Sequence, residues 1–417
     1  MSYFQTKDFQ TKLQRYAELI VKHGLNVKKG QIVNIGAEVA HRELAYQIAK
    51  ASYKQGAKFV NIDLNEPRLI KDRIENSTDE DLKFVPSYIS VKYDEILENT
   101  GANIRITGME DSEILSSLDP KKINTMRMQT RLALKKFYDE GIGKSKVQWT
   151  VVAGATTQWG KRIFPDLAEK EAEAALWEAI FKACRADKEN CLELWKEHNS
   201  KLHHRAKSIT AMKVKELHFT GPGTDLKVGL SKRAIFKGGS DTSPRKVEFE
   251  PNIPTEEVFT TPDYRETNGK VKATRPFLIN GVLIKDLEME FKNGILVNFK
   301  ASAGQDTFKA YIDSDEGAKR LGEVALVGID SPIFQSGIIF EEILYDENAA
   351  CHIAIGSAYK FCIEGGDSLT EEQAAEIGCN ESSVHTDMMI SSPKVDCVAT
   401  TYEGKKVELI KAGAWVI

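Results

Sequence analysis

The sequence has few cysteines, and no two of them stand at a metal-binding or redox spacing. Its 417 residues include six cysteines, none before position 184 and none in a C-x-x-C pair. A disulfide framework and a thiolate zinc ribbon are therefore not indicated, because both use closely spaced cysteines. The pattern is typical of a reducing compartment, and buried packing is the expected role of these thiols.

Long apolar runs and a large excess of either charge are also missing. No apolar stretch approaches the ~20 residues that cross a bilayer, and residues 1–16 lack the apolar core of a signal peptide. The sequence has 57 Lys and Arg and 61 Asp and Glu, which gives a net charge of −4. Because there is no excess of positive charge, neither nucleic acid nor a membrane is indicated as a partner. We expect a cytoplasmic protein of two domains, because a single core rarely exceeds roughly 250–300 residues.

The first half of the chain alternates helical and strand patterns. Apolar residues at helical spacing over 13–21 are followed by an apolar strand pattern, and the alternation continues to residue 153. Further helices are predicted over 41–54, 79–99 and 119–138, and strands over 31–35, 58–62, 103–107 and 148–153. Strands separated by such helices form a parallel sheet through crossover connections. We predict an α/β N-terminal domain with a parallel sheet over residues 1–205, ending in one or two long connecting helices over 166–208.

After residue 208 the pattern changes to short β segments joined by turns. Asn-Gly pairs occur at 268–269, 280–281 and 293–294, and the last two lie between apolar or β-branched segments. Asn-Gly tolerates the positive φ of type I′ turns and is therefore a hairpin signal. We predict an α+β C-terminal domain over 206–417 that is rich in antiparallel sheet and is interrupted by a helix over 308–321.

Several signatures of known catalytic sites are missing. Residues 143–145 resemble the end of a P-loop, but Tyr138 stands where that loop needs a glycine. No dinucleotide fingerprint, H-E-x-x-H motif or nucleophile elbow occurs. His198, His203 and His204 lie in a charged helical stretch, where a solvated helix face is the expected interpretation rather than a metal site.

Several carboxylates of the C-terminal half stand in or beside apolar segments. Glu323 lies within residues 321–327 (LGEVALV), where a carboxylate needs a partner charge or a metal ion. Glu256 and Glu257 precede the β-branched residues 258–261, and taken alone such a pair is more often solvated than coordinated. Glu323 is therefore the strongest single indication of a buried charged site.

Two histidines stand among further acids. Glu347 and His352 adjoin a short apolar run, and His385 and Asp387 are two residues apart. On a strand, residues two apart lie on the same face and can converge on one ion. A lone buried histidine is more often a hydrogen-bonded core residue. The joint occurrence favours a metal site, because buried carboxylates are costly unless cations neutralise them.

Together these residues form a predicted ligand set for divalent metal ions. The set is Glu257, Glu323, Glu347, His352, His385 and Asp387. Carboxylate and imidazole donors suit Zn²⁺, Co²⁺, Mn²⁺ or Mg²⁺. The number of ligands is large for one ion and adequate for two ions that share a carboxylate.

Four segments of the chain resemble the thermophilic-aminopeptidase family of metallopeptidases (M29), which includes aminopeptidases S and T. They are residues 252–262, 321–327, 346–359 and 385–390, whose order and spacing match the family; the N-terminal half matches in its α/β layout only. The resemblance implies a homodimer and two divalent ions per subunit bound by the residues of the predicted set, with Glu323 as the shared ligand. It also implies that Tyr359 is catalytic.

The resemblance implies an enzyme that hydrolyses N-terminal residues from peptides with a free amino terminus. Two divalent ions can lower the pKa of a water molecule towards neutrality and polarise the peptide carbonyl. Tyr359 would donate a hydrogen bond to the developing oxyanion, and Glu256 is a candidate general base or anchor for the substrate amine. If this segment is a strand, however, the side chains of Glu256 and Glu257 point to opposite faces, which argues against this role for Glu256.

Two other classes of protein fit the same residues. A two-metal hydrolase could act on another bond, such as a phosphoester or a cyclic amide, because two-metal sites serve several hydrolytic reactions. A two-domain binding protein could close its α/β half over a ligand and hold a structural ion in the acidic cluster.

Overall fold

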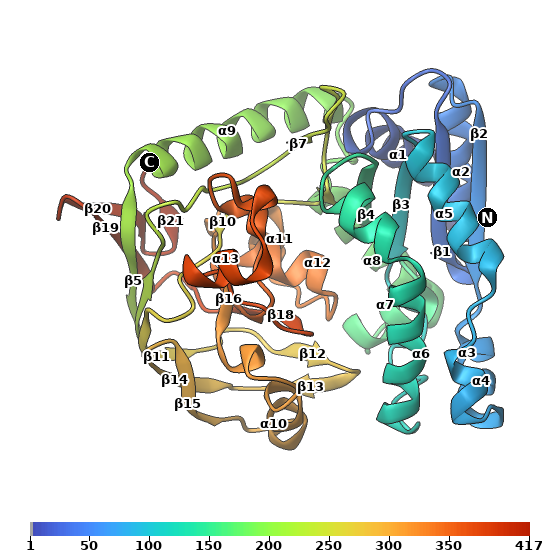
Figure 1. Ribbon diagram of the computed structural model, residues 1–417. Helices are drawn as coiled ribbons and strands as arrows, with labels where there is room; N and C mark the ends of the chain where they lie inside the picture. Colours follow the sequence, from blue (N-terminus) through green and yellow to red (C-terminus); the bar gives the residue numbers. More distant parts are fainter. Residues whose placement is uncertain (1–2) are drawn as a thin grey trace. The chain divides into compact units, whose positions relative to one another are not determined.

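The computed structural model describes residues 3–417, which form two compact units (Figure 1). Unit 1 contains the chain up to Lys196 together with Ser240–Pro254, and unit 2 contains Glu197–Gly239 and Thr255–Ile417. The predicted division into domains of residues 1–205 and 206–417 stays a prediction. In the described part of the chain, no helix has both the length and the apolar character that a membrane span requires.

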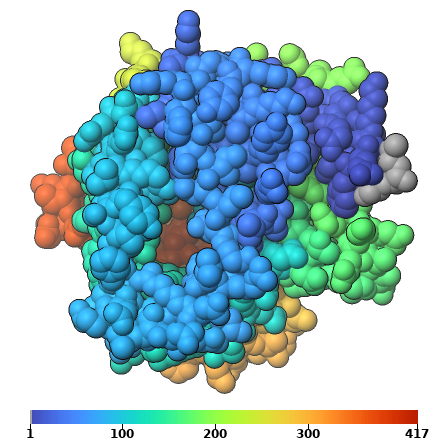
Figure 2. Space-filling view, turned by 90° about the vertical axis from the view of Figure 1, so that its right-hand side faces the viewer, coloured from blue at the N-terminus to red at the C-terminus, as the bar shows by residue number. Residues whose placement is uncertain are grey.

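Unit 1 is built on a five-stranded sheet of order β2-β1-β3-β4-β9, in which every pair is parallel. The strands are β1 (Ile32–Glu38), β2 (Phe59–Asn65), β3 (Ala102–Thr107), β4 (Gln148–Ala153) and β9 (Asn252–Ile253). The predicted parallel sheet is therefore confirmed. Figure 2 shows the face of this unit formed mainly by its early segments, coloured in shades of blue.

The helices of unit 1 connect these strands. They are α1 (Lys7–Leu19), α2 (Arg42–Lys54), α3 (Pro67–Asn76), α4 (Asp79–Lys83), α5 (Ser87–Glu98), α6 (Pro120–Ala133), α7 (Thr157–Ile163) and α8 (Glu169–Ala183). The helix predicted over 79–99 is wrong as a single element: Pro86 has extended dihedral angles and separates α4 from α5, because proline removes a helical hydrogen bond and disfavours helix before it. The helix predicted over 119–138 ends earlier, at Ala133, and a π-helical turn follows at Phe137–Ile142.

His41 is a buried histidine immediately before α2. Its Nε2 lies 3.0 Å from the carbonyl oxygens of both Gly108 and Gly154, just beyond β3 and β4. Burial lowers the pKa of this imidazole from 6.5 to about 4. Between pH 6.5 and 4 the unfolded chain therefore binds a proton at His41 that the folded protein does not bind. The free energy of unfolding is unaffected by this group above pH 6.5 and decreases as the pH falls towards 4.

Replacing His41 by Gln should flatten this pH dependence. Glutamine keeps an N–H donor for the two carbonyls but does not titrate. In the wild type, protonation of His41 in the unfolded state should lower the free energy of unfolding by up to about 3 kcal/mol as the pH falls from about 7 to about 4. Urea denaturation at both pH values, with a chelator in every sample, measures the difference. His204→Gln, at an exposed histidine, should keep the wild-type dependence. Identical behaviour of His41→Gln and the wild type would contradict the assignment.

Unit 2 contains two larger antiparallel sheets, which confirms the predicted C-terminal architecture. Their orders are β15-β14-β11-β6-β5-β19-β20-β21 and β10-β16-β17-β18. The strands of the first are β5 (Val214–Gly221), β6 (Thr224–Gly229), β11 (Thr267–Lys272), β14 (Glu288–Lys292), β15 (Ile295–Lys300), β19 (Asp396–Thr401), β20 (Lys406–Lys411) and β21 (Ala414–Trp415). Those of the second are β10 (Val258–Thr260), β16 (Leu321–Leu326), β17 (His352–Gly356) and β18 (His385–Met389).

Two of the three Asn-Gly pairs form hairpin turns. Asn280-Gly281 joins β12 (Phe277–Ile279) to β13 (Val282–Ile284), Asn293-Gly294 joins β14 to β15, and all four residues have positive φ. Asn268-Gly269 instead lies inside β11, which pairs with a strand on each side. The helix predicted over 308–321 is too long, because α10 covers Gln305–Ile312 and β16 already begins at Leu321.

The four-stranded sheet has one apolar face in the core of unit 2. Val324, Ile353 and Met388 of its three last strands belong to this core, together with Leu202 and Ile209 of the long helix α9 (Cys191–Ala211). All six cysteines are buried and form no disulfide bonds, which agrees with the packing role expected from the sequence. The opposite face of the sheet carries the candidate residues.

Candidate metal centre

Three adjacent strands of the four-stranded sheet present the candidate residues on one face. In the register of the sheet, Glu323 of β16 pairs with Ala354 of β17, which pairs with Asp387 of β18. Paired residues of antiparallel strands share a face, and so do residues two apart on one strand. His352 and His385 therefore lie on the same face as Glu323 and Asp387. The small side chain of Ala354 leaves room between the two carboxylates.

Glu323 stands between the two imidazoles. Its Oε1 lies 3.8 Å from Nε2 of His352, and its Oε2 lies 3.4 Å from Nε2 of His385. Asp387 Oδ1 is 3.6 Å from Nε2 of His385 and 4.0 Å from Nε2 of His352. Glu257, just before β10, places Oε2 3.1 Å from Nε2 of His352. Five of the six predicted ligands are thus in one cluster.

The cluster contains two groups of donors that have one residue in common. Glu257, Glu323 and His352 form the first group, and Glu323, His385 and Asp387 form the second. Within each group the donor atoms lie within 4.8 Å of one another. Carboxylate oxygens together with one imidazole nitrogen per group fit borderline divalent ions such as zinc, cobalt or manganese.

Both imidazoles are oriented for metal binding by their second nitrogen. Nδ1 of His352 lies 3.2 Å from the carbonyl oxygen of Ala350, and Nδ1 of His385 lies 2.7 Å from that of Ser357. A carbonyl only accepts hydrogen bonds, so Nδ1 carries the proton in each ring. Nε2 of each ring therefore faces the carboxylates, where a metal ion could replace its proton, as a metal-ligating histidine requires.

The electrostatics of the cluster favour an added positive charge. Burial, followed by the charges of neighbouring carboxylates, raises the pKa values of Glu257 and Glu347 above the usual range. Burial alone would lower the pKa of His352, but the neighbouring carboxylates of Glu257 and Glu323 raise that pKa well above the usual value. The raised pKa values favour protonated Glu257 and Glu347 when no cation is bound, and divalent ions would replace those protons.

Glu347 lies at the edge of the cluster. It begins the 3-10 turn η6 (Glu347–Ala349), is half-buried, and belongs to neither group of donors. Its Oε1 accepts a hydrogen bond from Nδ2 of Asn348 at 3.4 Å. The charges of Asp387 and Glu257 contribute to its raised pKa, so its carboxylate is within electrostatic reach of the other acids.

Tyr359 lies beside the cluster, beyond the end of β17. Its backbone N–H donates to the Thr261 hydroxyl at 3.1 Å, and that hydroxyl donates to the Tyr359 carbonyl at 2.8 Å. The ring stacks on Phe361 at 5.1 Å and lies 5.2 Å from the ring of His385. Tyr359 is 37% exposed, so it is not a core tyrosine. Although the residue as a whole is partly exposed, loss of water around the hydroxyl and the charge of Glu323 raise the pKa of Tyr359 well above the usual value, so the hydroxyl keeps its proton and can donate a hydrogen bond.

Glu256 is close to the predicted ligands but faces a different partner. Its Oε2 lies 3.4 Å from Nε2 of His198 on α9, and its backbone N–H donates to Oδ1 of Asn348 at 2.7 Å. Both Glu256 and Glu257 are 7% exposed, so the solvated interpretation of this pair is wrong. The two residues precede β10 rather than lying in a strand, yet their carboxylates do turn to different partners.

Two residues that contact Glu256 were not among the predicted site residues. Asn348 lies within the segment 346–359 that carries the family resemblance, which was a usable signal. His198 lies outside every such segment, and its charged neighbours suggested a solvated face. Its side chain is only 13% exposed, so that interpretation is wrong for His198, whereas His203 and His204 are exposed.

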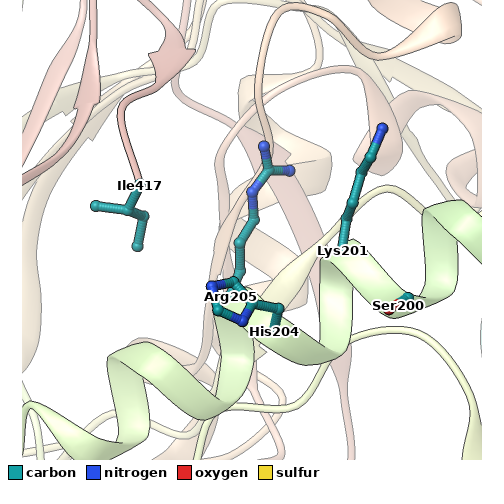
Figure 3. A pocket seen from close by; sticks show the side chains of 5 residues that line it. All are labelled: Ser200, Lys201, His204, Arg205 and Ile417. Carbon is teal, nitrogen blue, oxygen red and sulfur yellow. The ribbon is translucent and has the colours of Figure 1, made fainter.

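A separate cavity of about 350 Å³ lies beside α9 (Figure 3). It is lined by Ser200, Lys201, His204, Arg205 and Ile417. The Arg205 guanidinium also stacks over the ring of Trp415 at 4.5 Å. None of the predicted site residues lines this cavity.

Comparisons with known proteins extend over nearly the whole chain. A family model described as thermophilic metalloprotease (M29) matches residues 9–415. Aminopeptidase AmpS of Bacillus subtilis is 37% identical over 407 residues, which are 98% of this chain and 99% of that protein. Aminopeptidase T of Thermus thermophilus is 36% identical over 409 residues, again 98% and 99%. A solved structure of wild-type AmpT from Thermus thermophilus matches with a TM-score of 0.91 at 34% identity, covering 98% of this chain and 100% of that one.

Proposed function

The chain belongs to the thermophilic metalloprotease family (M29), and on that premise we propose that it removes N-terminal residues from peptides at a centre of two divalent metal ions. Membership confirms the resemblance found in the four segments and makes the protein a metal-dependent hydrolase of peptide bonds. The ion count, the residues that bind the ions and their roles belong to the proposal.

The observation that carries the proposal is the position of Glu323. Its two carboxylate oxygens face two different imidazoles, those of His352 and His385. A carboxylate in that position suits a bridge between two ions. In our assignment Glu257 and His352 complete the first site. The second is completed by His385 and Asp387, and Glu347 is a further ligand at the edge.

The chain's own residues would then act around the bound ions. When bound, two divalent ions supply a charge that polarises the peptide carbonyl and lower the pKa of a water molecule. The Tyr359 hydroxyl donates a hydrogen bond to the oxygen of that carbonyl as negative charge develops there. Glu256, next to the ligand Glu257, accepts a proton or binds the substrate's α-ammonium group. Recognition of that ammonium group would restrict cleavage to the first peptide bond.

Removal of metal should abolish the activity, and a divalent ion should restore it. The test measures amino acid release from an unblocked peptide and from its N-acetylated form, before and after treatment with a chelator and after addition of Zn²⁺, Co²⁺, Mn²⁺ or Mg²⁺. We expect release from the unblocked peptide alone, lost with the chelator and regained with an ion. Turnover of phosphoesters or cyclic amides without peptide cleavage would favour a different hydrolase, and no turnover at all would favour a binding protein.

Two expectations from the sequence accompany this proposal. The active form is proposed to be a homodimer, which analytical ultracentrifugation of the purified protein tests. The cytoplasmic location likewise stays a prediction.

A further inference from the structure

Tyr359 lies beside the candidate metal cluster but outside the sheet that carries the cluster. It comes after the end of β17 at Gly356 and directly before the 3-10 turn η7 (Lys360–Cys362). Its ring nevertheless lies 5.2 Å from the ring of His385. A reacting group that is misplaced by about 1 Å can lower a rate about 100-fold. The contacts that fix Tyr359 in place therefore bear directly on the proposed catalysis.

Three consecutive N–H groups fix the backbone that leads into this residue. Those of Ser357 and Ala358 donate to backbone carbonyl oxygens of a neighbouring loop, at 2.7 and 3.0 Å. The N–H of Tyr359 donates to a side chain instead, the hydroxyl of Thr261, at 3.1 Å. Of these three contacts, the last is the one whose acceptor a substitution can remove.

The Thr261 hydroxyl contacts the backbone of Tyr359 twice. Besides accepting from the N–H, it donates to the Tyr359 carbonyl oxygen at 2.8 Å, and that oxygen also accepts from the Cys362 N–H at 3.1 Å. A hydroxyl can donate one hydrogen bond while it accepts another, so the two contacts are compatible. Thr261 is fully buried. Valine at this position would fill the same space, so that no water molecule would take over the two lost hydrogen bonds.

Thr261 also belongs to the part of the sheet that lies next to the proposed shared ligand. It directly follows β10, whose last residue, Thr260, pairs with Val324 of β16. Val324 is the neighbour of Glu323 in that strand. The Thr261 hydroxyl thus joins the backbone of Tyr359 to the strand pair that carries Glu323.

Aromatic packing holds the ring of Tyr359 but does not replace this link. The ring stacks on Phe361 at 5.1 Å, but Phe361 lies in the turn that follows Tyr359 and would move with it. Phe259 of β10 meets the same ring edge-to-face at 6.1 Å. That contact limits where the ring can lie, whereas the backbone on which the ring is mounted is tied to the sheet by Thr261.

We propose that Thr261 is a positioning residue: its hydroxyl holds the backbone of Tyr359 so that the phenol is directed at the substrate carbonyl. The proposal rests on the catalytic role proposed above for Tyr359. Because Thr261 acts through Tyr359, it should affect the rate of the chemical step more than the binding of substrate or metal.

The test compares two substitutions of this threonine. Thr261→Val keeps the shape of the side chain but removes the hydroxyl, and we expect kcat to fall about 10- to 100-fold with KM and metal content close to those of the wild type. Thr261→Ser keeps the hydroxyl and loses a methyl group, so it should keep most of the rate at a lower free energy of unfolding. Circular dichroism at the assay temperature verifies that each variant is folded.

A double variant and a neighbouring threonine separate positioning from general loss of stability. In a protein that already carries Tyr359→Phe, adding Thr261→Val should lower kcat little further, because the hydroxyl that Thr261 positions is gone. The control is Thr260→Val. Thr260 is also fully buried, and its hydroxyl donates to the carbonyl oxygen of Ile235 at 2.9 Å, so this variant should keep the wild-type kcat.

The proposal would be overturned by a wild-type kcat in Thr261→Val, by equal losses of kcat in Thr261→Val and Thr261→Ser, by an equal loss in Thr260→Val, or by losses that multiply in the double variant. A wild-type kcat in Tyr359→Phe would instead refute the catalytic role on which the proposal rests.

Discussion

Replacing Glu323 by Gln should remove both metal ions and reduce peptide hydrolysis by about 1,000-fold or more, because metal ions contribute several kcal/mol to the transition state and each 1.36 kcal/mol is a factor of ten. Glutamine has nearly the same shape but lacks the charge and one of the two acceptor oxygens that face His352 and His385. Each proposed ion would lose a ligand through this single substitution. Metal analysis and peptide hydrolysis on the same preparation measure the two losses together.

A matched control is available in unit 1. Glu250 is also buried, at 1% exposure, and its Oε2 lies 3.4 Å from Nε2 of His23, so Glu250→Gln makes the same chemical change in another glutamate–histidine pair. That variant should bind two ions and hydrolyse peptides at the wild-type rate, even if its free energy of unfolding is lower. Retention of two tightly bound ions by Glu323→Gln would refute the assignment of Glu323 as the shared ligand.

Replacing Tyr359 by Phe should lower kcat by about 100- to 1,000-fold, the usual cost of removing one hydrogen-bond donor to an oxyanion. The ring packing on Phe361 and the backbone hydrogen bonds to Thr261 do not involve the hydroxyl. The fold and the metal content should therefore be unchanged, and KM should change far less than kcat. Steady-state kinetics together with metal analysis on this variant separate the catalytic role from a structural one.

Tyr402 provides the control for this variant. It is 36% exposed, nearly the same as Tyr359, but its hydroxyl donates to the carbonyl oxygen of Leu230 at 2.7 Å. Tyr402→Phe should cost about 1 kcal/mol of stability and leave kcat unaltered. If Tyr359→Phe turned over at the wild-type rate, Tyr359 would be reduced to a packing residue.

The fold could be predicted wherever local chemistry determines the backbone. Strand β4 coincides with its predicted range, and the turns at Asn280-Gly281 and Asn293-Gly294 form because asparagine and glycine tolerate positive φ. The same dipeptide at Asn268-Gly269 lies within a strand, because pairing on both sides of β11 outweighs its turn preference. Strand β9 has only two residues and depends on its pairing with β4, which no local pattern reveals.

The site could be predicted in part for the same kind of reason. Glu323 was recognisable because its apolar neighbours imply burial, and the His385–Asp387 spacing reveals a shared face on a strand. Glu256 and Glu257 are not flanked by apolar residues on both sides, and the histidines that their carboxylates contact, His198 and His352, are distant in sequence. The burial of the His198 side chain, which is 13% exposed, is likewise a property of tertiary packing and has no local signal.

Whether two divalent ions share Glu323 can be seen by anomalous diffraction from crystals of the metal-loaded protein, recorded at the absorption edge of the bound metal. We predict two anomalous peaks per chain, roughly 3.5–4 Å apart, one near His352 and the other near His385, with the Glu323 carboxylate between them. A single peak, or two peaks that do not both contact Glu323, would contradict the shared-ligand assignment.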